Sequence, residues 1–553
     1  MDTTRLILIT SLTLVSLLLY EAWQRDYGLR VVPPPTTADG AAAVPPDLPP
    51  GADEIPAMSE AAESPAISET VPEQQSQADY IDVYTDVLHL KINKRGGALE
   101  YAELLQYPVE VKQQDVPVVF LDNSNSLVHV IQTGLLGQSA PNHQDRLTGT
   151  QDEYRLQDRD ELRVPLHWQD ANGVTVSKVF VLRRGSYLID IDYQINNPSS
   201  EPWVASTYSQ IKRDTAGTGR KLVYTYTGAV ISSPEDRYSK IDFDEIEEQD
   251  LSLSIKNGWA AMLQHYFVSA IIPTLSDSAY QFSTKALKRN QYLIRAVSPL
   301  QRVEAGAEGR LNSRVYVGPK LQEQLAEAAE GLELTVDYGI LFFIAKPLFW
   351  CLAKFHELTG NWGWAIILVT IVLKLLFFPL SAAGYRSMAN MRRVQPRMMA
   401  MKERYKDDRN GLNQAMMKLY KEEKINPFGG CLPILVQIPV FIALYWVLLE
   451  SVELRQAYFA LWLVDLSSPD PYWVLPIIMG ATMLIQQKLN PAPMDPLQQK
   501  VLMIMPFAFT IFFGFFPSGL VLYWVANNIL SIAQQWQITR GLEKAGLAAG
   551  TKK

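Results

Sequence analysis

The stretch AIILVTIVLKLLFFPL, Ala365–Leu380, places a lysine in the middle of an otherwise apolar run. Residues 361–383 are long enough to cross a bilayer, because about 20 helical residues at ~1.5 Å each span a hydrocarbon core of ~30 Å. Lys374 lies 12 residues after Trp362 and 12 residues before Arg386. It therefore lies near the bilayer midplane, where a charge costs at least ~2.5–3.5 kcal/mol. The stretch predicts a membrane-spanning helix that carries a cation.

The charges divide the 553-residue chain into an acidic part and a basic part. Residues 1–80 hold 3 Lys/Arg and 12 Asp/Glu, and residues 341–553 hold 21 and 12. These parts are expected to lie in different environments. The two cysteines form no CxxC or zinc-type cluster, the six histidines are scattered, and no GxxxxGK[ST] run exists. The sequence therefore predicts no catalytic set, no metal and no cofactor, so the protein is not expected to be an enzyme.

The N-terminal region predicts an anchor followed by a tether. Residues 1–25 are expected to form an uncleaved signal-anchor span, because an apolar run follows Arg5 without a small-x-small cleavage site. Residues 26–79 are expected to be a disordered tether, since residues 31–78 hold 10 Pro, 10 Ala and no Lys or Arg. Residues 80–335 alternate apolar and polar side chains, as in YIDVYTDVLHLKI, which predicts a β-sandwich.

The remaining residues predict a helical membrane part. Residues 336–360 are apolar but interrupted by Lys346 and Lys354, which favours an amphipathic helix in the interface plane; another span is the alternative. Residues 361–384 form the predicted second span, and residues 428–540 the third to sixth spans. The predicted fold class is thus a polytopic α-helical membrane protein with six spans, of which five form a core, and a β-sandwich domain.

The basic segments set the expected orientation. The segment 385–427 is predicted to be a cytoplasmic helical hairpin, because residues 385–424 hold 11 Lys/Arg and 5 Asp/Glu. Residues 541–553 form a basic cytoplasmic tail. Six spans then place both termini in the cytoplasm and the sandwich in the periplasm. The hairpin also holds seven methionines, which suit either capture of varied apolar segments or the seam between the two helices: Met388, Met391, Met398, Met399, Met401, Met416 and Met417.

Polar side chains recur inside the predicted spans. Thr370 lies one turn before Lys374, Thr482 lies one turn before Gln486, and the last span carries a stripe at i, i+4 and i+8. In hydrocarbon these groups need a partner or water, so they predict a shared hydrated groove or, alternatively, interhelical hydrogen bonds. The candidate groove residues are Lys374, Thr370, Gln437, Thr482, Gln486, Asn527, Ser531 and Gln535.

Lys374 has no acidic residue in any span core to pair with. This argues against a proton relay or an ion-coupled transporter, which needs acidic groups in its pathway. It suggests that a visiting molecule supplies the counter-ion. A lysine that extends to cytoplasmic water without a function remains an alternative.

Three motifs carry a family resemblance: NPFGGCLPILVQIPVF (426–441), SVELRQAYFALWLVDLSSPDPY (451–472) and FPSGLVLYW (516–524). They resemble the YidC-type membrane protein insertases of Gram-negative bacteria, and the match runs from about residue 340 to 545. The resemblance implies a five-span core with a hydrophilic groove that is open to the cytoplasm and to lipid. It implies that Lys374 occupies a position that is usually arginine. It also implies substrate contacts at Thr370 and at Trp524, with Tyr523 before it.

The expected function is insertion of nascent membrane proteins, and their folding, in the bacterial inner membrane, alone or with the Sec translocon. The expected partners are nascent chains, the Sec translocon, the ribosome through the basic cytoplasmic segments, and the lipid bilayer, with no nucleic-acid specificity. The alternative is a small-solute transporter or channel with a periplasmic carbohydrate-binding domain, against which the missing membrane acids and the missing inverted repeat argue.

Overall fold

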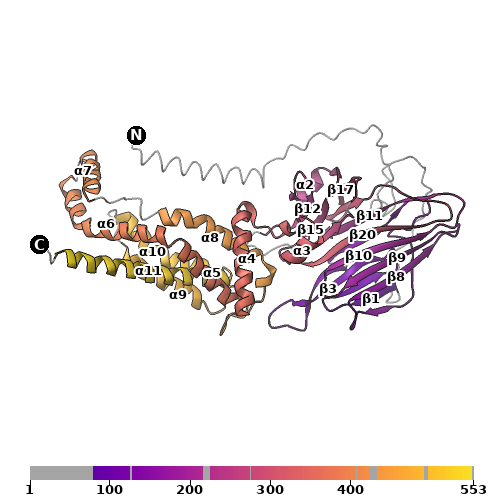
Figure 1. The fold of residues 1–553 in the computed structure, drawn as a ribbon, viewed down its shortest axis with the longest axis horizontal. Coiled ribbons are helices and arrows are strands. Elements are labelled where there is room, and N and C mark those ends of the chain that lie inside the picture. Colours follow the sequence, from indigo (N-terminus) through magenta and orange to yellow (C-terminus); the bar gives the residue numbers. More distant parts are fainter. Residues whose placement is uncertain are drawn as a thin grey trace.

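The computed structural model describes residues 79–550 except 125–126, 216–224, 275, 406–407, 424–431 and 491–495. The predicted anchor (1–25) and the tether (26–79), apart from its last residue, lie outside the described residues. Figure 1 shows a part rich in β-strands beside a bundle of helices, with a transverse helix between them.

Two sheets form the β-rich part, so the prediction of a domain rich in β-sheet is confirmed. The first is 11-stranded and contains, in order, β14 (Ser252–Ile255), β17 (Tyr280–Leu287), β18 (Gln291–Val297), β11 (Trp203–Asp214), β5 (Leu127–Leu136), β4 (Pro117–Ser124), β3 (Ala98–Pro108), β2 (Leu88–Asn93), β1 (Tyr80–Tyr84) and β7 (Glu153–Arg155), with β19 (Gln301–Val303) beside β11. The second is 9-stranded and contains, in order, β13 (Ser239–Ile241), β12 (Gly228–Ser232), β15 (Trp259–Leu263), β16 (Phe267–Ile272), β20 (Glu308–Pro319), β10 (Leu188–Asn196), β9 (Thr175–Arg183), β8 (Glu161–Gln169) and β6 (Thr148–Gly149).

The alternating pattern of each strand decides which side chains the sheets bury. In β10 every second residue is buried, among them Ile189 and Ile191, while Asp190 and Asp192 between them are partly exposed. Ile81 and Leu90 of the first sheet are also fully buried and belong to the same core. This two-residue period is what a half-buried strand requires. Two short helices, α2 (Phe243–Glu248) and α3 (Gln322–Ala328), accompany the sheets.

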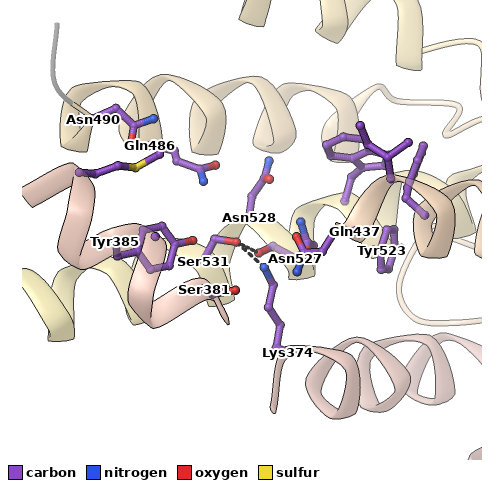
Figure 2. Close-up of a pocket in the computed structure, with 15 residues that line it drawn as sticks. Lys374, Ser381, Tyr385, Gln437, Gln486, Asn490, Tyr523, Asn527, Asn528 and Ser531 are labelled. Atoms are coloured by element: carbon purple, nitrogen blue, oxygen red, sulfur yellow. Dashed lines mark hydrogen bonds between the residues drawn. The ribbon is translucent and has the colours of Figure 1, made fainter. Parts of the chain in front are cut away.

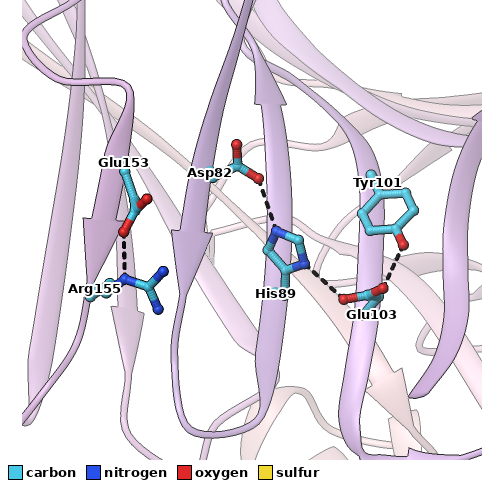
Figure 3. Close-up of polar contacts among 6 residues, drawn as sticks. All are labelled: Asp82, His89, Tyr101, Glu103, Glu153 and Arg155. Atoms are coloured by element: carbon cyan, nitrogen blue, oxygen red, sulfur yellow. Dashed lines mark hydrogen bonds and ion pairs between the residues drawn. The ribbon is translucent and has the colours of Figure 1, made fainter. Parts of the chain in front are cut away.

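A cross-strand row of polar side chains joins β1, β2 and β3 (Figure 3). His89 of β2 lies between two carboxylates, with Nε2 2.9 Å from Asp82 and Nδ1 2.7 Å from Glu103. Tyr101 donates its hydroxyl hydrogen to Glu103 over 2.6 Å. The imidazole ring also stacks on Tyr84, with 4.2 Å between the ring centroids. His89 lies directly opposite Tyr84 and Glu103 on the neighbouring strands, and directly opposed pairs of this kind stabilise a sheet by about 0.2–1 kcal/mol each.

The helices follow the sheets in sequence. They are η3 (Leu332–Thr335), η4 (Gly339–Leu341), α4 (Phe342–Thr359), α5 (Trp362–Leu376), α6 (Phe378–Arg404), α7 (Arg409–Glu422), α8 (Leu432–Glu450), η5 (Val452–Leu454), α9 (Val474–Leu489), α10 (Pro496–Phe513) and α11 (Ser518–Gly550).

By length and composition alone, these helices do not establish six spans. Among the described residues, Gly339–Thr359 is long and apolar enough to cross a membrane, and α5 with α6 qualifies as a bent pair. The other apolar helices, within α8, α9 and α10, are shorter. The six-span topology therefore stays a prediction. Figure 1 shows α4 running across the end of the bundle, transverse to α5 and α11, which favours an interfacial position for α4 over another span.

The predicted second span differs from the observed helices at its C-terminal end. Residues 361–384 were expected to form one helix, but α5 ends at Leu376 and α6 begins at Phe378 with a bend of 67°. Pro379 lies in the first turn of α6. Proline has no N–H to continue the hydrogen bonds of α5 and is well suited to a helix start. The first helix of the predicted hairpin (385–427) is therefore part of α6, which begins at Phe378. Residues 541–550 of the predicted tail belong to α11.

Polar contacts attach the β-rich part to the bundle near the end of α8. The Tyr338 hydroxyl lies 3.1 Å from Ser451 Oγ, and His265 Nε2 lies 3.1 Å from the Leu449 carbonyl. Glu453, in η5 beside these contacts, has a carboxylate oxygen that is buried without a hydrogen-bond partner. Burial raises the pKa of Glu453 to about 7.

The raised pKa of Glu453 makes the junction less stable as pH rises. Between its unfolded pKa, near 4.5, and about 7 the unfolded state loses this proton while the folded state keeps it. We expect the free energy of unfolding of Glu453→Gln, relative to that of the wild-type chain, to rise by about 1–2 kcal/mol from about pH 5 to pH 8. This value is below the full effect of the pKa shift because the side chain is partly exposed. Thermal unfolding of both proteins across this range measures the difference. A constant difference would contradict the prediction.

Candidate functional site

A polar cavity lies among the membrane helices α5, α6, α8, α9 and α11 (Figure 2). Its volume is about 280 Å³. Its lining combines hydroxyl and amide groups with aromatic rings and a cation: Lys374, Ser381, Gly384, Tyr385, Met388, Gln437, Ile438, Phe441, Gln486, Asn490, Tyr523, Trp524, Asn527, Asn528 and Ser531.

Lys374 points into this cavity from α5 (Figure 2). Its Nζ donates a hydrogen bond of 2.7 Å to Ser531 Oγ on α11, and Ser531 donates in turn to the Asn527 carbonyl over 2.7 Å. Within the described part of the chain, no carboxylate forms an ion pair with Lys374. A hydroxyl satisfies one donor of an ammonium group but does not neutralise its charge, so the cavity keeps a positive charge available.

The structure brings most of the predicted groove residues together. Seven line the cavity: Lys374, Gln437, Gln486, Tyr523, Trp524, Asn527 and Ser531. Thr370 lines a smaller adjoining pocket, which it shares with Lys374.

Two predicted groove residues instead form hydrogen bonds between neighbouring segments of the bundle. Thr482 links α9 to α11, and Gln535 links α11 to Asn490, the residue that follows α9. Thr482 accepts a 3.1 Å hydrogen bond from Asn528 Nδ2, and Gln535 Nε2 donates to Asn490 Oδ1 over 3.0 Å. Neither Thr482 nor Gln535 is among the lining residues of the cavity. Both uses of polar side chains that the sequence left open, a shared cavity and interhelical hydrogen bonds, therefore occur in this bundle.

Sequence reasoning missed the contribution of α6 to the cavity. Ser381, Tyr385 and Met388 lie within two turns and line the same cavity. The sequence shows their spacing of about one turn. Residues from 385 on are predicted to belong to the cytoplasmic hairpin, so their contribution to the cavity was not expected. Asn528 was also missed, although it follows the predicted Asn527 directly.

Aromatic rings form the wall of the cavity near the start of α11. Trp524 lies 4.9 Å from Phe441 and 5.5 Å from Phe513, measured between ring centroids. Figure 2 shows Tyr523 at the opposite end of the cavity from Tyr385 and Asn490. The cavity therefore has an apolar end toward the β-rich part and a polar end toward the hairpin.

The seven predicted hairpin methionines occupy three different positions. Four lie in or against the apolar seam between α6 and α7: Met391, Met398, Met401 and Met416. Met399 and Met417 are 57% and 52% exposed. Met388 lines the cavity. The seam thus accounts for four methionines and leaves Met399 and Met417 as the exposed candidates for capture.

These features define a class of protein: an α-helical membrane protein with a β-sheet domain and a polar, positively charged cavity within its bundle. Residues 80–351 match the family described as YidC periplasmic domain, and residues 354–545 match the family described as 60Kd inner membrane protein. The chain belongs to the YidC family of membrane protein insertases. It is a membrane protein insertase of the inner membrane, and its β-rich part is the periplasmic domain.

Individual relatives cover nearly the whole chain. The chain is 51% identical to the membrane protein insertase YidC of Methylococcus capsulatus, over 98% of this chain and 99% of the relative. It is 48% identical to that of Thioalkalivibrio sulfidiphilus, over 99% of this chain and 100% of the relative. A crystal structure described as an active YidC insertase with its first transmembrane domain resolved is 21% identical over 84% of this chain and 92% of its own, with a TM-score of 0.37.

Proposed function

We propose that the cavity receives the polar end of a membrane protein during insertion and that Lys374 supplies its counter-ion. The position of the Lys374 ammonium, inside the cavity and bonded to a hydroxyl only, supports this role most directly. A carboxylate on the visiting segment would pair with Lys374, while the amides of Gln437, Gln486 and Asn527 offer further hydrogen bonds. The reaction is a transfer between solvents and needs no covalent chemistry.

The energetics favour release into lipid. The cavity shortens the distance over which polar groups cross hydrocarbon, where each unpaired group costs several kcal/mol. The apolar span of the substrate gains about 0.3–0.6 kcal/mol for each Leu, Ile, Phe or Val that enters the bilayer. Over ~20 residues this gain exceeds the energy of a hydrated ion pair, so the substrate does not stay bound.

Several finer features belong to the same proposal. Six spans place both termini in the cytoplasm, where the basic hairpin and tail meet the ribosome or a nascent chain. The protein also assists folding beside the Sec translocon. The hairpin carries exposed methionines and cations, which support contact with apolar and anionic surfaces respectively.

Substitution of Lys374 tests the proposed counter-ion. Lys374→Arg should be tolerated, because it keeps the charge. Lys374→Ala should weaken insertion by about 1–2 kcal/mol for substrates with acidic tails and much less for neutral ones, since water screens the pair in a hydrated cavity. Lys374→Glu should be worse than alanine for acidic tails. The measurement is insertion yield into liposomes for one substrate with zero, one or two tail aspartates.

Ser531→Ala is the matched control for this series. It removes the hydroxyl that Lys374 contacts but keeps the charge, so it should preserve the preference for acidic tails. If every variant changed the yield of acidic and neutral substrates in parallel, the counter-ion role would be refuted and Lys374 would serve only to hydrate the cavity.

A further inference from the structure

The hairpin between β3 and β4 exposes apolar side chains to the surroundings. Its tip, residues 109–116, begins and ends at a pair in which the Val109 N–H donates to the Val116 carbonyl over 2.8 Å. Val109 and Val116 are 46% and 48% exposed, and Leu105 and Val119 on the adjoining strands are 39% and 43% exposed. The hairpin thus exposes four aliphatic side chains, and such exposure is unfavourable in water.

Hydrogen bonds attach the base of this hairpin to the bundle. Arg455 donates from its guanidinium to the Pro108 carbonyl over 2.7 Å, and Gln456 Nε2 donates to the same oxygen over 2.9 Å. Both residues lie in the loop between α8 and α9. The position of the hairpin is therefore coupled to the loop that joins two membrane helices.

The same loop also contacts the start of a membrane helix. Asn361, the N-cap residue of α5, donates from Nδ2 to the Phe459 carbonyl over 3.0 Å. The four residue steps from Arg455 to Phe459 extend at most about 14 Å, and half of the hairpin tip extends about 13 Å. Figure 1 shows the hairpin that follows β3 reaching from the sheets toward the bundle. The tip is thus within reach of the membrane surface at the periplasmic end of α5.

We propose that the hairpin tip rests in the interfacial region of the periplasmic leaflet, beside the exposed loop residues Tyr458 and Leu461. Tyr458 is 55% exposed and Leu461 is 78% exposed. The loop that carries them is braced by Asp465, which accepts hydrogen bonds from the Gln456 and Ser467 N–H groups over 3.0 and 2.8 Å. A braced loop can present an apolar side chain to lipid without paying for its ordering at the moment of contact.

The composition of the surface favours lipid as its occupant over another protein. The apolar side chains of the tip alternate with the charged Glu110, Lys112 and Asp115. This mixture suits the boundary between headgroups and acyl chains, where apolar groups enter about 5–10 Å and charged groups stay hydrated. Helix α4, which contacts α5 and α8, also exposes apolar side chains: Phe343 and Trp350 are 61% and 62% exposed.

Depth-dependent fluorescence quenching tests this contact in the full chain. In a Cys351→Ser, Cys431→Ser background, Val116→Cys is labelled with a nitrobenzoxadiazole probe and the protein is reconstituted into vesicles of phosphatidylethanolamine and phosphatidylglycerol. We expect lipids with a nitroxide near the headgroup to quench at least about half of the emission, as for a group in the interface. The proposal would be overturned if these lipids did not quench the probe. That outcome includes a probe that is shielded from lipid because another part of the protein covers it, as its emission would show.

Asn172→Cys is the matched control position. Asn172 is exposed in the turn before β9. The other end of β9 lies near α3, because Gln324 Nε2 of α3 donates to the carbonyl of Gly185, which follows β9, over 3.0 Å. The nine residues of β9 separate these ends by about 30 Å. We expect less than about a tenth of the emission to be quenched at this distance, beyond the interfacial layer. Equal quenching at both positions would overturn the proposal.

A second variant tests the attachment itself. Arg455→Ala with Gln456→Ala removes both hydrogen bonds to Pro108 and should lower quenching of the probe at position 116 by about half, because the hairpin then moves freely. The readout does not depend on insertion activity, so it stands apart from the role of the cavity. Unchanged quenching would overturn the role of Arg455 and Gln456 in holding the tip at the membrane.

Discussion

Deleting residues 391–423 should abolish insertion while the polar cavity stays intact. The deletion removes the paired parts of α6 and α7 but keeps Ser381, Tyr385 and Met388, which line the cavity. The lost segment carries the exposed methionines and most of the hairpin's cations, which are expected to meet the substrate first. Insertion yield in liposomes measures the loss, and the thermal unfolding midpoint of the purified variant checks that the bundle is folded.

Methionine substitutions separate capture from hairpin stability. Met399→Ser with Met417→Ser changes the two exposed side chains and should lower insertion several-fold without unfolding the hairpin, because a polar hydroxyl replaces a flexible apolar surface. Met398→Leu, in the buried seam, is the matched control and should keep normal insertion, since such swaps usually cost less than ~1.5 kcal/mol. A stable deletion variant that inserts substrates at the normal rate would rule out the capture role.

Lys178→Met should destabilise the periplasmic domain by about 3–5 kcal/mol, since it leaves buried carbonyl groups without their donor. Lys178 lies in β9 and is 2% exposed. Its Nζ donates to the carbonyls of Gly96, Gly97 and Thr133 over 2.7, 3.1 and 2.8 Å. These bonds tie the second sheet to β5 and to the β2–β3 turn of the first, and burial lowers the pKa of Lys178. Urea unfolding of the full chain, followed by circular dichroism, measures the loss.

Lys94→Met is the control for charge removal at a more exposed position. Lys94, whose side chain is 16% exposed, forms a 2.6 Å ion pair with Asp152, whose side chain is 78% exposed. Ion pairs with a solvent-exposed partner contribute about 0–1 kcal/mol, so this variant should unfold close to the wild-type midpoint. Equal losses for the two variants would show that the buried carbonyl bonds of Lys178 contribute little.

Local patterns in the sequence determined the kinds of elements and the class of protein. The alternation in β10 and the apolar run of α5 each depend on neighbouring residues only, so they could be predicted from the chain itself. Lys374 was recognisable because a charge in an apolar run conflicts with its surroundings wherever the helix packs. The motifs around residues 426–441 and 516–524 pointed to the insertase family, which the relatives confirm.

The tertiary structure alone decided which of these residues meet. Lys374 and its partner Ser531 are 157 residues apart, and the cavity draws side chains from five helices. Thr482 and Gln535 have the same polar character as the lining residues but pair across helices α9 and α11 or with the residue that follows α9. Helical periodicity gives the face of a side chain on its own helix, but the rotation of one helix against another comes from packing between distant segments. For the same reason the attachment of Arg455 to Pro108 had no counterpart in any local pattern, whereas the break at Phe377 is accompanied by the local signal of Pro379.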